Sequence, residues 1–178
     1  MKKLALILLA LLVLSGGAFA QSDIGLKGAG VRLGLVDPDG IDSTIGFEGF
    51  ADLGTFNKFA LEASILFWKK TVDPVSLRDL AFGVTGRYFF DMGESGVKPF
   101  ASAGVGLHMV KSEVDFDLGF FGGSGTTDAS STEFGIKVGG GANYDINEKM
   151  AFTGEVSFHL GDIEQLNILG GISYKLGE

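Results

Sequence analysis

The segment Lys58-Phe-Ala-Leu-Glu-Ala-Ser-Ile-Leu-Phe67 carries the pattern that decides the fold. Every second residue from Phe59 to Phe67 is apolar, while the residues between them are small, polar or charged, except for Leu66. An apolar period of two predicts a β-strand with one apolar face, because successive side chains of a strand point to opposite sides. The segment is therefore expected to be a strand that separates two different environments.

Seven further segments alternate in the same way, four of them clearly and three more weakly. Eight segments of roughly ten residues have the length that a tilted transmembrane strand requires. The sequence therefore predicts an all-β fold, an eight-stranded antiparallel up-and-down transmembrane β-barrel. The clear segments are 80–90, 133–144, 152–160 and 166–176, and the weaker ones are about 26–36, 44–53 and 98–110.

The connections are expected to alternate in length along the chain. Those after the second, fourth and sixth strands are short, at 54–57, 91–97 and 145–149. Those after the first, third and fifth strands are longer, and the longest spans about 112–131, while the connection after the seventh strand breaks the trend. Short turns on one side and longer loops on the other are typical of outer-membrane barrels. This pattern places the short turns and both termini in the periplasm.

The first twenty residues have the pattern of a cleaved, helical signal peptide. Lys2 and Lys3 precede the apolar run Leu4–Leu14, and Ala18-Phe-Ala20 offers small residues before a cleavage site at Gln21. The apolar run is too short to span a bilayer as a helix. We therefore expect residues 1–20 to be removed on export and residues 21–178 to form the barrel domain.

Composition excludes several classes of function. The chain has no cysteine, so it has no disulfides, thiolate metal site or lipid-bearing cysteine. Its formal net charge is −8, which disfavours a nucleic-acid partner. It contains 29 glycines but only 3 prolines, with 16 phenylalanines, which suits a curved sheet better than a disordered linker.

The two faces of the strands indicate which one meets lipid. The polar face is rich in Gly, Ala, Ser and Thr, which fit the narrow lumen of an eight-stranded barrel. The apolar face carries the large residues, with aromatics near strand ends, as in interfacial girdles. A soluble periplasmic barrel would need large apolar groups inside, and it stays as the residual alternative. The aromatics concerned are Phe59, Phe67, Tyr88, Phe90, Tyr144 and Tyr174.

Isolated charges on the inward face predict an ion network inside the lumen. Opposite residues of an antiparallel pair have a constant index sum, so the turn positions predict which charges lie opposite one another. These sums predict a band Arg32–Glu48–Glu62–Arg87 and a separate pair Lys137–Glu155, facing each other across the lumen. The whole predicted set is Arg32, Glu48, Glu62, Arg87, Glu133, Lys137 and Glu155.

Two functions of this network stay open from the sequence. Buried charges need partners, so alternating signs would close the lumen and fix the strand register. The alternative is a narrow passive pore for small solutes, or a gate that opens when ion-pair partners exchange.

The chain resembles the small, porin-like, eight-stranded outer-membrane barrels over about residues 24–176. The resemblance rests on the signal peptide and on three stretches: Gly30-Val-Arg-Leu-Gly34, the region from Tyr88 to Gly106, and Tyr144-Asp-Ile-Asn-Glu-Lys-Met-Ala-Phe152. It implies a protein of the outer membrane of a Gram-negative cell envelope. It specifies the fold far better than the activity.

Enzymatic and metal-binding alternatives are weaker. Some similar barrels deacylate lipid A with a His-x-Ser pair and a Glu; here Ser157 and His159 occur in the reverse order and face the lumen, with Glu155 and Glu164 nearby. A site built on His108 and His159 is conceivable, and the stretch from Asp37 to Asp42 resembles a calcium loop. That stretch lacks the ligand spacing of such a loop and is better interpreted as a Pro-Asp-Gly turn. We therefore predict no catalytic site, no metal and no cofactor.

The longest connection, 112–131, is expected to be a mobile extracellular loop because it is rich in Gly, Ser and Thr. Phe120 and Phe121 near its tip could contact another surface. We therefore predict a monomeric barrel with a structural or surface-interaction role. Its expected partners are outer-membrane lipid and lipopolysaccharide and, during export, periplasmic chaperones and the barrel insertion machinery.

Overall fold

The computed structural model describes residues 23–72, 74–93, 96–117 and 124–176. The predicted signal peptide and the loop residues Phe120 and Phe121 lie outside these residues. Among the residues described, no helix is long and apolar enough to cross a membrane.

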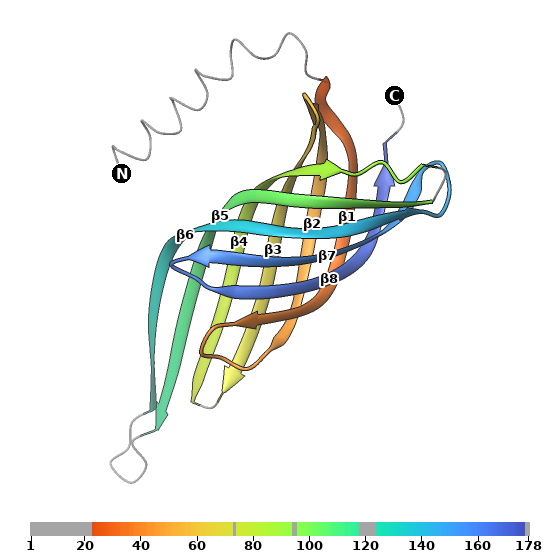
Figure 1. The fold of residues 1–178 in the computed structure, drawn as a ribbon. Coiled ribbons are helices and arrows are strands. Elements are labelled where there is room, and N and C mark those ends of the chain that lie inside the picture. The colour runs from red at the N-terminus through yellow and green to blue at the C-terminus, as the bar shows by residue number, and fades with distance from the viewer. Residues whose placement is uncertain (1–22, 73, 94–95, 118–123, 177–178) are drawn as a thin grey trace, which may run out of the picture.

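Eight antiparallel strands form one closed barrel in which each strand pairs with its neighbours in sequence and the first pairs with the last (Figure 1). This confirms the predicted fold class. The strands are β1 (Asp23–Pro38), β2 (Thr44–Phe56), β3 (Phe59–Val72), β4 (Val75–Phe89), β5 (Val97–Asp117), β6 (Ser124–Asp145), β7 (Met150–Gly161) and β8 (Gln165–Lys175).

The barrel buries its charges and exposes its large apolar side chains. Arg32, Glu48 and Glu62 are 1%, 3% and 3% exposed, whereas Leu33 and Phe47 beside them in sequence are 57% and 51% exposed. The same alternation runs through all eight strands, so the apolar face points outward. An outward apolar surface of this extent is stable only against hydrocarbon, which assigns lipid to the bulky face and agrees with the sequence prediction.

Aromatic rings gather around one end of the barrel. The three tyrosines, Tyr88, Tyr144 and Tyr174, are exposed near the ends of β4, β6 and β8. Tyr88 packs edge-on against Phe90, with ring centroids 5.3 Å apart, and lies 6.0 Å from Phe59. Since β1 begins and β8 ends at this side, this ring lies at the rim that the sequence prediction places in the periplasm, called the inner end below.

The outer side differs from the expectation of long loops. β3 continues to Val72 and β4 begins at Val75, so the third connection is a tight turn. Pairing of β5 with β6 runs on to Asp117↔Ser124, so the described part of the expected loop 112–131 is a β-hairpin. Pairing satisfies backbone amides that a loop would leave to water, and Thr and Val favour strands. This hairpin projects past the remaining strands at one end of the barrel (Figure 1).

Two turns follow from local chemistry. Ile41 N–H donates to the carbonyl of Pro38 at 3.3 Å, and Gly40 has φ 73°, so the Asp37–Asp42 stretch contains the expected turn. At the inner side, Asn57 has φ 57°, a conformation that Asn tolerates better than most residues, and it joins β2 to β3.

The connections at the two ends do not differ in length as expected. The inner connection between β4 and β5 spans 90–96 and is longer than the outer β3–β4 turn. The length asymmetry therefore lies in the strands rather than in the connections.

Candidate functional site: the luminal ion network

Six charged side chains meet inside the barrel. Arg32 lies at their centre: its Nη2 is 2.5 Å from Glu62 Oε2, and its Nη1 contacts Glu48 and lies 3.4 Å from Glu155 Oε2. Three cations and three carboxylates take part, so the network is formally neutral. Neutrality and mutual contact are what allow charges to stay buried. The members are Arg32, Glu48, Glu62, Arg87, Lys137 and Glu155.

Glu155 joins the two groups that the sequence placed apart. Its Oε1 accepts from Lys137 Nζ at 2.9 Å and from Ser102 Oγ at 3.0 Å, while its Oε2 lies 3.2 Å from Arg87 Nη2. The separate band and pair of the prediction are thus a single connected network. Both guanidinium groups also lie over aromatic rings: Arg32 is 3.8 Å from the centroid of Phe50, and Arg87 is 4.7 Å from that of Phe100.

The predicted register is correct for one pair and wrong for the others. Arg32 lies opposite Glu48, as expected. Glu48 lies opposite Leu66 rather than Glu62, because the β2–β3 turn lies between Phe56 and Phe59, later in the chain than expected.

The two remaining pairs are also offset by the positions of their turns. Arg87 lies opposite Ala60 instead of Glu62, because the β3–β4 turn lies between Val72 and Val75 and is centred earlier in the chain than this pair requires. Lys137 lies opposite His159 instead of Glu155, because the β6–β7 turn is centred later in the chain. The ion pairs form despite this, since Arg and Lys reach diagonal neighbours on the same face.

Glu133 does not enter the network. It is only half-buried and lies opposite His108 near the outer end. Its Oε1 accepts from Ser131 Oγ at 2.8 Å. The alternation placed Glu133 on the inward face, but its height along β6 separates it from the other charges.

A second buried polar cluster lies nearer the outer mouth, and the sequence did not reveal it. Asp79 Oδ2 is 2.7 Å from His108 Nδ1, and His108 Nε2 is 3.1 Å from His159 Nδ1. Asp79 and His108 are fully buried. The sequence prediction did not include Asp79, because the strand that carries it was expected to begin at 80. Asp79 has an odd residue number, like the inward-facing residues of β4, and this was the signal in the sequence that its side chain points into the lumen.

This geometry gives no support to the metal and enzyme alternatives. Within the residues described, no group of three or more His, Cys, Asp or Glu could hold a metal ion. Ser157 is 1% exposed inside the lumen, and His159 already contacts His108. A Ser–His pair in this position faces away from the lipid in which an acyl chain would lie.

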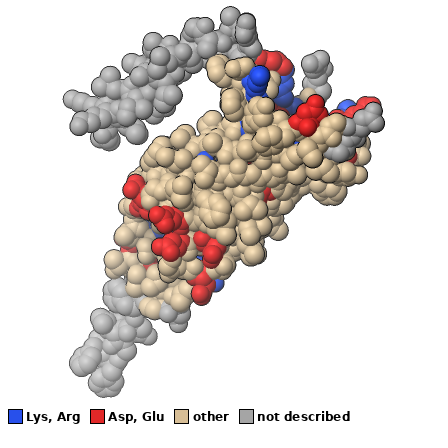
Figure 2. Space-filling model, viewed as in Figure 1, with Lys and Arg blue, Asp and Glu red and all other residues tan. Residues whose placement is uncertain are grey.

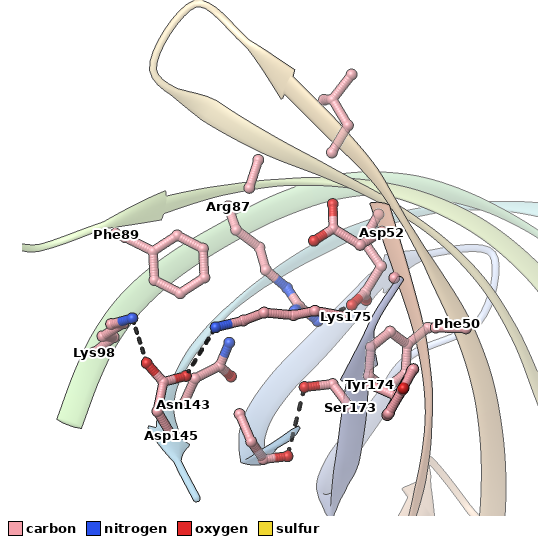
Figure 3. A pocket seen from close by; sticks show the side chains of 16 residues that line it. Phe50, Asp52, Arg87, Phe89, Lys98, Asn143, Asp145, Ser173, Tyr174 and Lys175 are labelled. Atoms are coloured by element: carbon pink, nitrogen blue, oxygen red, sulfur yellow. Dashed lines mark hydrogen bonds and ion pairs between the residues drawn. The ribbon is translucent and has the colours of Figure 1, made fainter. Parts of the chain in front are cut away.

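Cavities of different size lie at the two ends of the barrel and between them. At the inner mouth, Lys98 and Lys175 reach Asp145 at 2.5 and 3.4 Å beside a cavity of about 240 Å³, which Glu62 and Arg87 also line (Figure 3). At the outer mouth, a hollow of about 530 Å³ reaches down to His159. A cavity between the ion network and the histidines measures about 10 Å³, room for one water molecule at most.

The comparisons with known proteins agree with the closed β-barrel fold. A model of the outer membrane protein beta-barrel domain matches residues 6–175. The chain belongs to this family. It is therefore an outer-membrane β-barrel embedded in the lipid bilayer, with ion pairs buried in its lumen. A comparison with curated protein sequences finds no match.

Solved structures share the fold at low sequence identity. Neisserial surface protein A is 16% identical with a TM-score of 0.58, and the alignment covers 84% of this chain and 95% of that one. The N-terminal β-barrel domain of OprF from Pseudomonas aeruginosa is 12% identical with a TM-score of 0.58, over 85% and 99%. Ail, the attachment invasion locus protein of Yersinia pestis, is 14% identical with a TM-score of 0.57, over 85% and 97%.

Proposed function

We propose that this protein is a non-conducting barrel that binds an extracellular protein partner through the open edge of its projecting sheet. The observation that carries the proposal is an unequal pairing of β6. On one side, β6 pairs with β5 out to Ser124. On the other side, its pairing with β7 ends at Gly135↔Gly161. The stretch 124–133 therefore has one side without a paired strand among the residues described.

The direction of the free amides follows from the alternation of the strand. The carbonyl of Phe134 points toward β7, because it accepts from Asp162 N–H at 3.5 Å. At the other end, Asp145 N–H donates to Gly96 on the β5 side at 3.4 Å. Even-numbered residues of β6 thus direct their backbone groups away from β5. Thr132, Ser130 and Asp128 accordingly direct theirs to the open edge.

An open strand edge is a template for pairing with another chain. An extended segment of a partner could add to it as a further strand, with backbone hydrogen bonds supplying affinity. From Thr127 to Thr132 the side chains are exposed and all but Ala129 are polar, which keeps an unpaired edge soluble. Two proteins of similar fold bear names that fit a surface role, surface protein A and attachment invasion locus protein.

The test is adherence of bacteria that display the protein to cultured epithelial cells. Ser130→Pro removes a backbone N–H that faces the open edge while leaving those that pair with β5. We expect the wild-type protein to raise adherence over cells that lack it and Ser130→Pro to remove that gain. Ser130→Ala keeps the N–H and is the matched control, which should adhere like wild type.

Folding of each variant is checked on gels, because a folded barrel that has not been heated migrates differently from the same protein after heating. Wild-type adherence by the folded Ser130→Pro barrel would contradict the open-edge proposal. Equal loss in Ser130→Ala would also contradict it, because the side chain and not the backbone edge would then be responsible.

A further inference from the structure

Three basic side chains lie in one row across the outward face of the barrel wall. Lys69 of β3 lies opposite Arg78 of β4, and Arg78 lies opposite Lys111 of β5. All three continue the outward face of their strands, since Phe67 and Met109, two positions away, are 45% and 49% exposed. The row therefore runs around the outside of the barrel, next to lipid.

The row marks the outer boundary of the apolar band. Two residues nearer the membrane centre on each strand, the next outward row consists of Phe67, Leu80 and Met109, which lie opposite one another and are all apolar. Two residues farther from the membrane centre on each strand, the next row consists of Thr71, Ser76 and Glu113. Lipid headgroups lie at the level where an apolar band gives way to polar residues.

Like charges directly opposite one another in a sheet repel. Glu113 relieves part of this repulsion, since it lies 3.3 Å from Arg78 and 3.1 Å from Lys111. Lys111 also lies 3.2 Å from Asp128. No ion pair with Lys69 is found among the residues described, so the row keeps an excess of positive charge on its membrane side.

A groove lies beside this row. Its volume is about 450 Å³, and Phe67, Leu80 and Met109 line its membrane side. Arg78 and Lys111 line it together with the hydroxyl-bearing Ser130 and Thr132 of β6. The groove thus joins an apolar floor to a cationic, hydroxyl-lined rim, which is the chemistry of an acyl chain that ends in a phosphate-bearing headgroup.

The rest of the rim has the opposite charge. The outward faces of β1, β7 and β8 end at Asp37, Asp162 and Glu164, each two positions beyond the last outward apolar residue of its strand. Figure 2 shows acidic side chains gathered close to the end of the barrel from which the hairpin projects. A phosphate is attracted by the β3–β5 side and repelled by the other, so the charge pattern selects one side of the barrel.

We propose that the row Lys69, Arg78 and Lys111, with its adjoining groove, is a binding site for a phosphorylated, acylated lipid of the outer leaflet. The phosphate lies between the basic side chains, and an acyl chain lies along Phe67, Leu80 and Met109. The site shares the side chains of Ser130 and Thr132 with the open-edge stretch of β6, but it does not require the open backbone edge. It would fix the rotational position of the barrel relative to the lipids around it.

The experiment titrates the detergent-solubilised barrel with bisphosphorylated lipid A and counts bound lipid by native mass spectrometry, with EDTA present to remove bridging cations. The test variant is Lys69→Gln/Arg78→Gln. Each basic residue near an anionic lipid is worth about a factor of five in affinity, so we expect binding to weaken about 25-fold. Lipid A without its phosphates should bind the wild-type protein as weakly as the intact lipid binds this variant.

The matched control is Lys58→Gln/Lys149→Gln, which removes the same charge from exposed turns at the inner end. It should bind like wild type, and equal weakening would overturn the site in favour of a general charge effect. Unchanged binding by the folded test variant would also overturn it. Displacement of the lipid by millimolar inorganic phosphate would reassign the row as a simple anion site, because an anchored lipid should resist it.

Discussion

Glu155 touches more of the luminal network than its position in the sequence suggests. One carboxylate accepts from Lys137 and Ser102 and faces both Arg32 and Arg87. It is the bridge between the charges carried by β1–β4 and the one carried by β6. Removing a single partner of a buried ion pair leaves its neighbours uncompensated, which costs more than the pair itself contributes.

We therefore predict that Glu155→Gln lowers the free energy of unfolding by about 3 kcal/mol or more. Gln keeps the shape of the side chain, but it leaves three luminal cations facing two carboxylates. Urea unfolding in lipid vesicles measures the change, with the fluorescence of Trp68, the one tryptophan of the chain, as the signal.

Glu133→Gln provides the control for this prediction. Glu133 is half-buried and accepts from Ser131 instead of a luminal cation. Its substitution should change the stability by less than about 0.5 kcal/mol. A Glu155→Gln barrel as stable as Glu133→Gln would mean that the network does not hold the fold together.

How far the network could be predicted depends on what each step required. Which charges point inward follows from a period of two, so Arg32, Glu48 and Glu62 could be placed on the lumen face from sequence. Which charges touch depends on register, and register depends on where each turn is centred. The β2–β3 turn lies between Phe56 and Phe59, later than expected, which moves every pair of that hairpin. The apolar alternation of the strands does not reveal the exact centre of a turn. The long side chains tolerate the error, which is why the ion pairs form although most predicted opposite positions are wrong.

At the level of the elements, the seam between β1 and β8 decides whether the sheet closes. These strands pair from Gly28↔Lys175 to Pro38↔Gln165. Near the middle, Gly171 lies opposite Arg32, and a Cβ on Gly171 would overlap the carbonyl oxygen of Val31 and lie 2.7 Å from the Cα of Arg32. The backbones approach so closely here that a side chain at 171 would push the seam apart.

We predict that Gly171→Ala destabilises the barrel by about 1–3 kcal/mol, the usual cost of overpacking. Gly154→Ala on the neighbouring strand β7 is the control, because a Cβ there would meet no atom within 4 Å. That change should be neutral or slightly stabilising, since Ala restricts the unfolded chain. The fraction of barrel that stays folded at rising urea, read from gel mobility, compares the two. Equal stability of both variants would rule out close packing at the seam.

The strand number and the side of each residue were available from sequence, but the outer strand ends were not. The residues 68–79 and 112–131 lose the strict apolar alternation once they leave the membrane, and the alternation was the signal used. Thr71 and Val72, or the run of Ser and Thr before Glu133, are compatible with strands outside lipid as well as with loops. Their pairing depends on partners across the hairpin, which a single strand does not display.

For the whole molecule, the lipid outside and the polar lumen inside explain why apolar side chains face outward and charged side chains face inward. Hydrocarbon outside requires apolar side chains there, so polar residues remain only for the lumen. With eight strands, that lumen is narrow enough for side chains to fill. The luminal charges balance, and their contacts cross it between β1, β2, β3, β4, β6 and β7. A filled and neutral interior favours closure over conduction.

We predict that the wild-type protein, reconstituted into planar bilayers, shows no stable single-channel steps. Ions would have to displace the contacts between Arg32 and its carboxylates and pass a cavity of about 10 Å³. The variant Glu62→Ala/Arg87→Ala removes one contacting pair without changing the net charge, and it enlarges the cavity at the inner mouth. Brief conducting events are expected from this variant, at a frequency above that of wild type. Stable, ohmic steps from the wild-type barrel would contradict closure and establish the narrow pore instead.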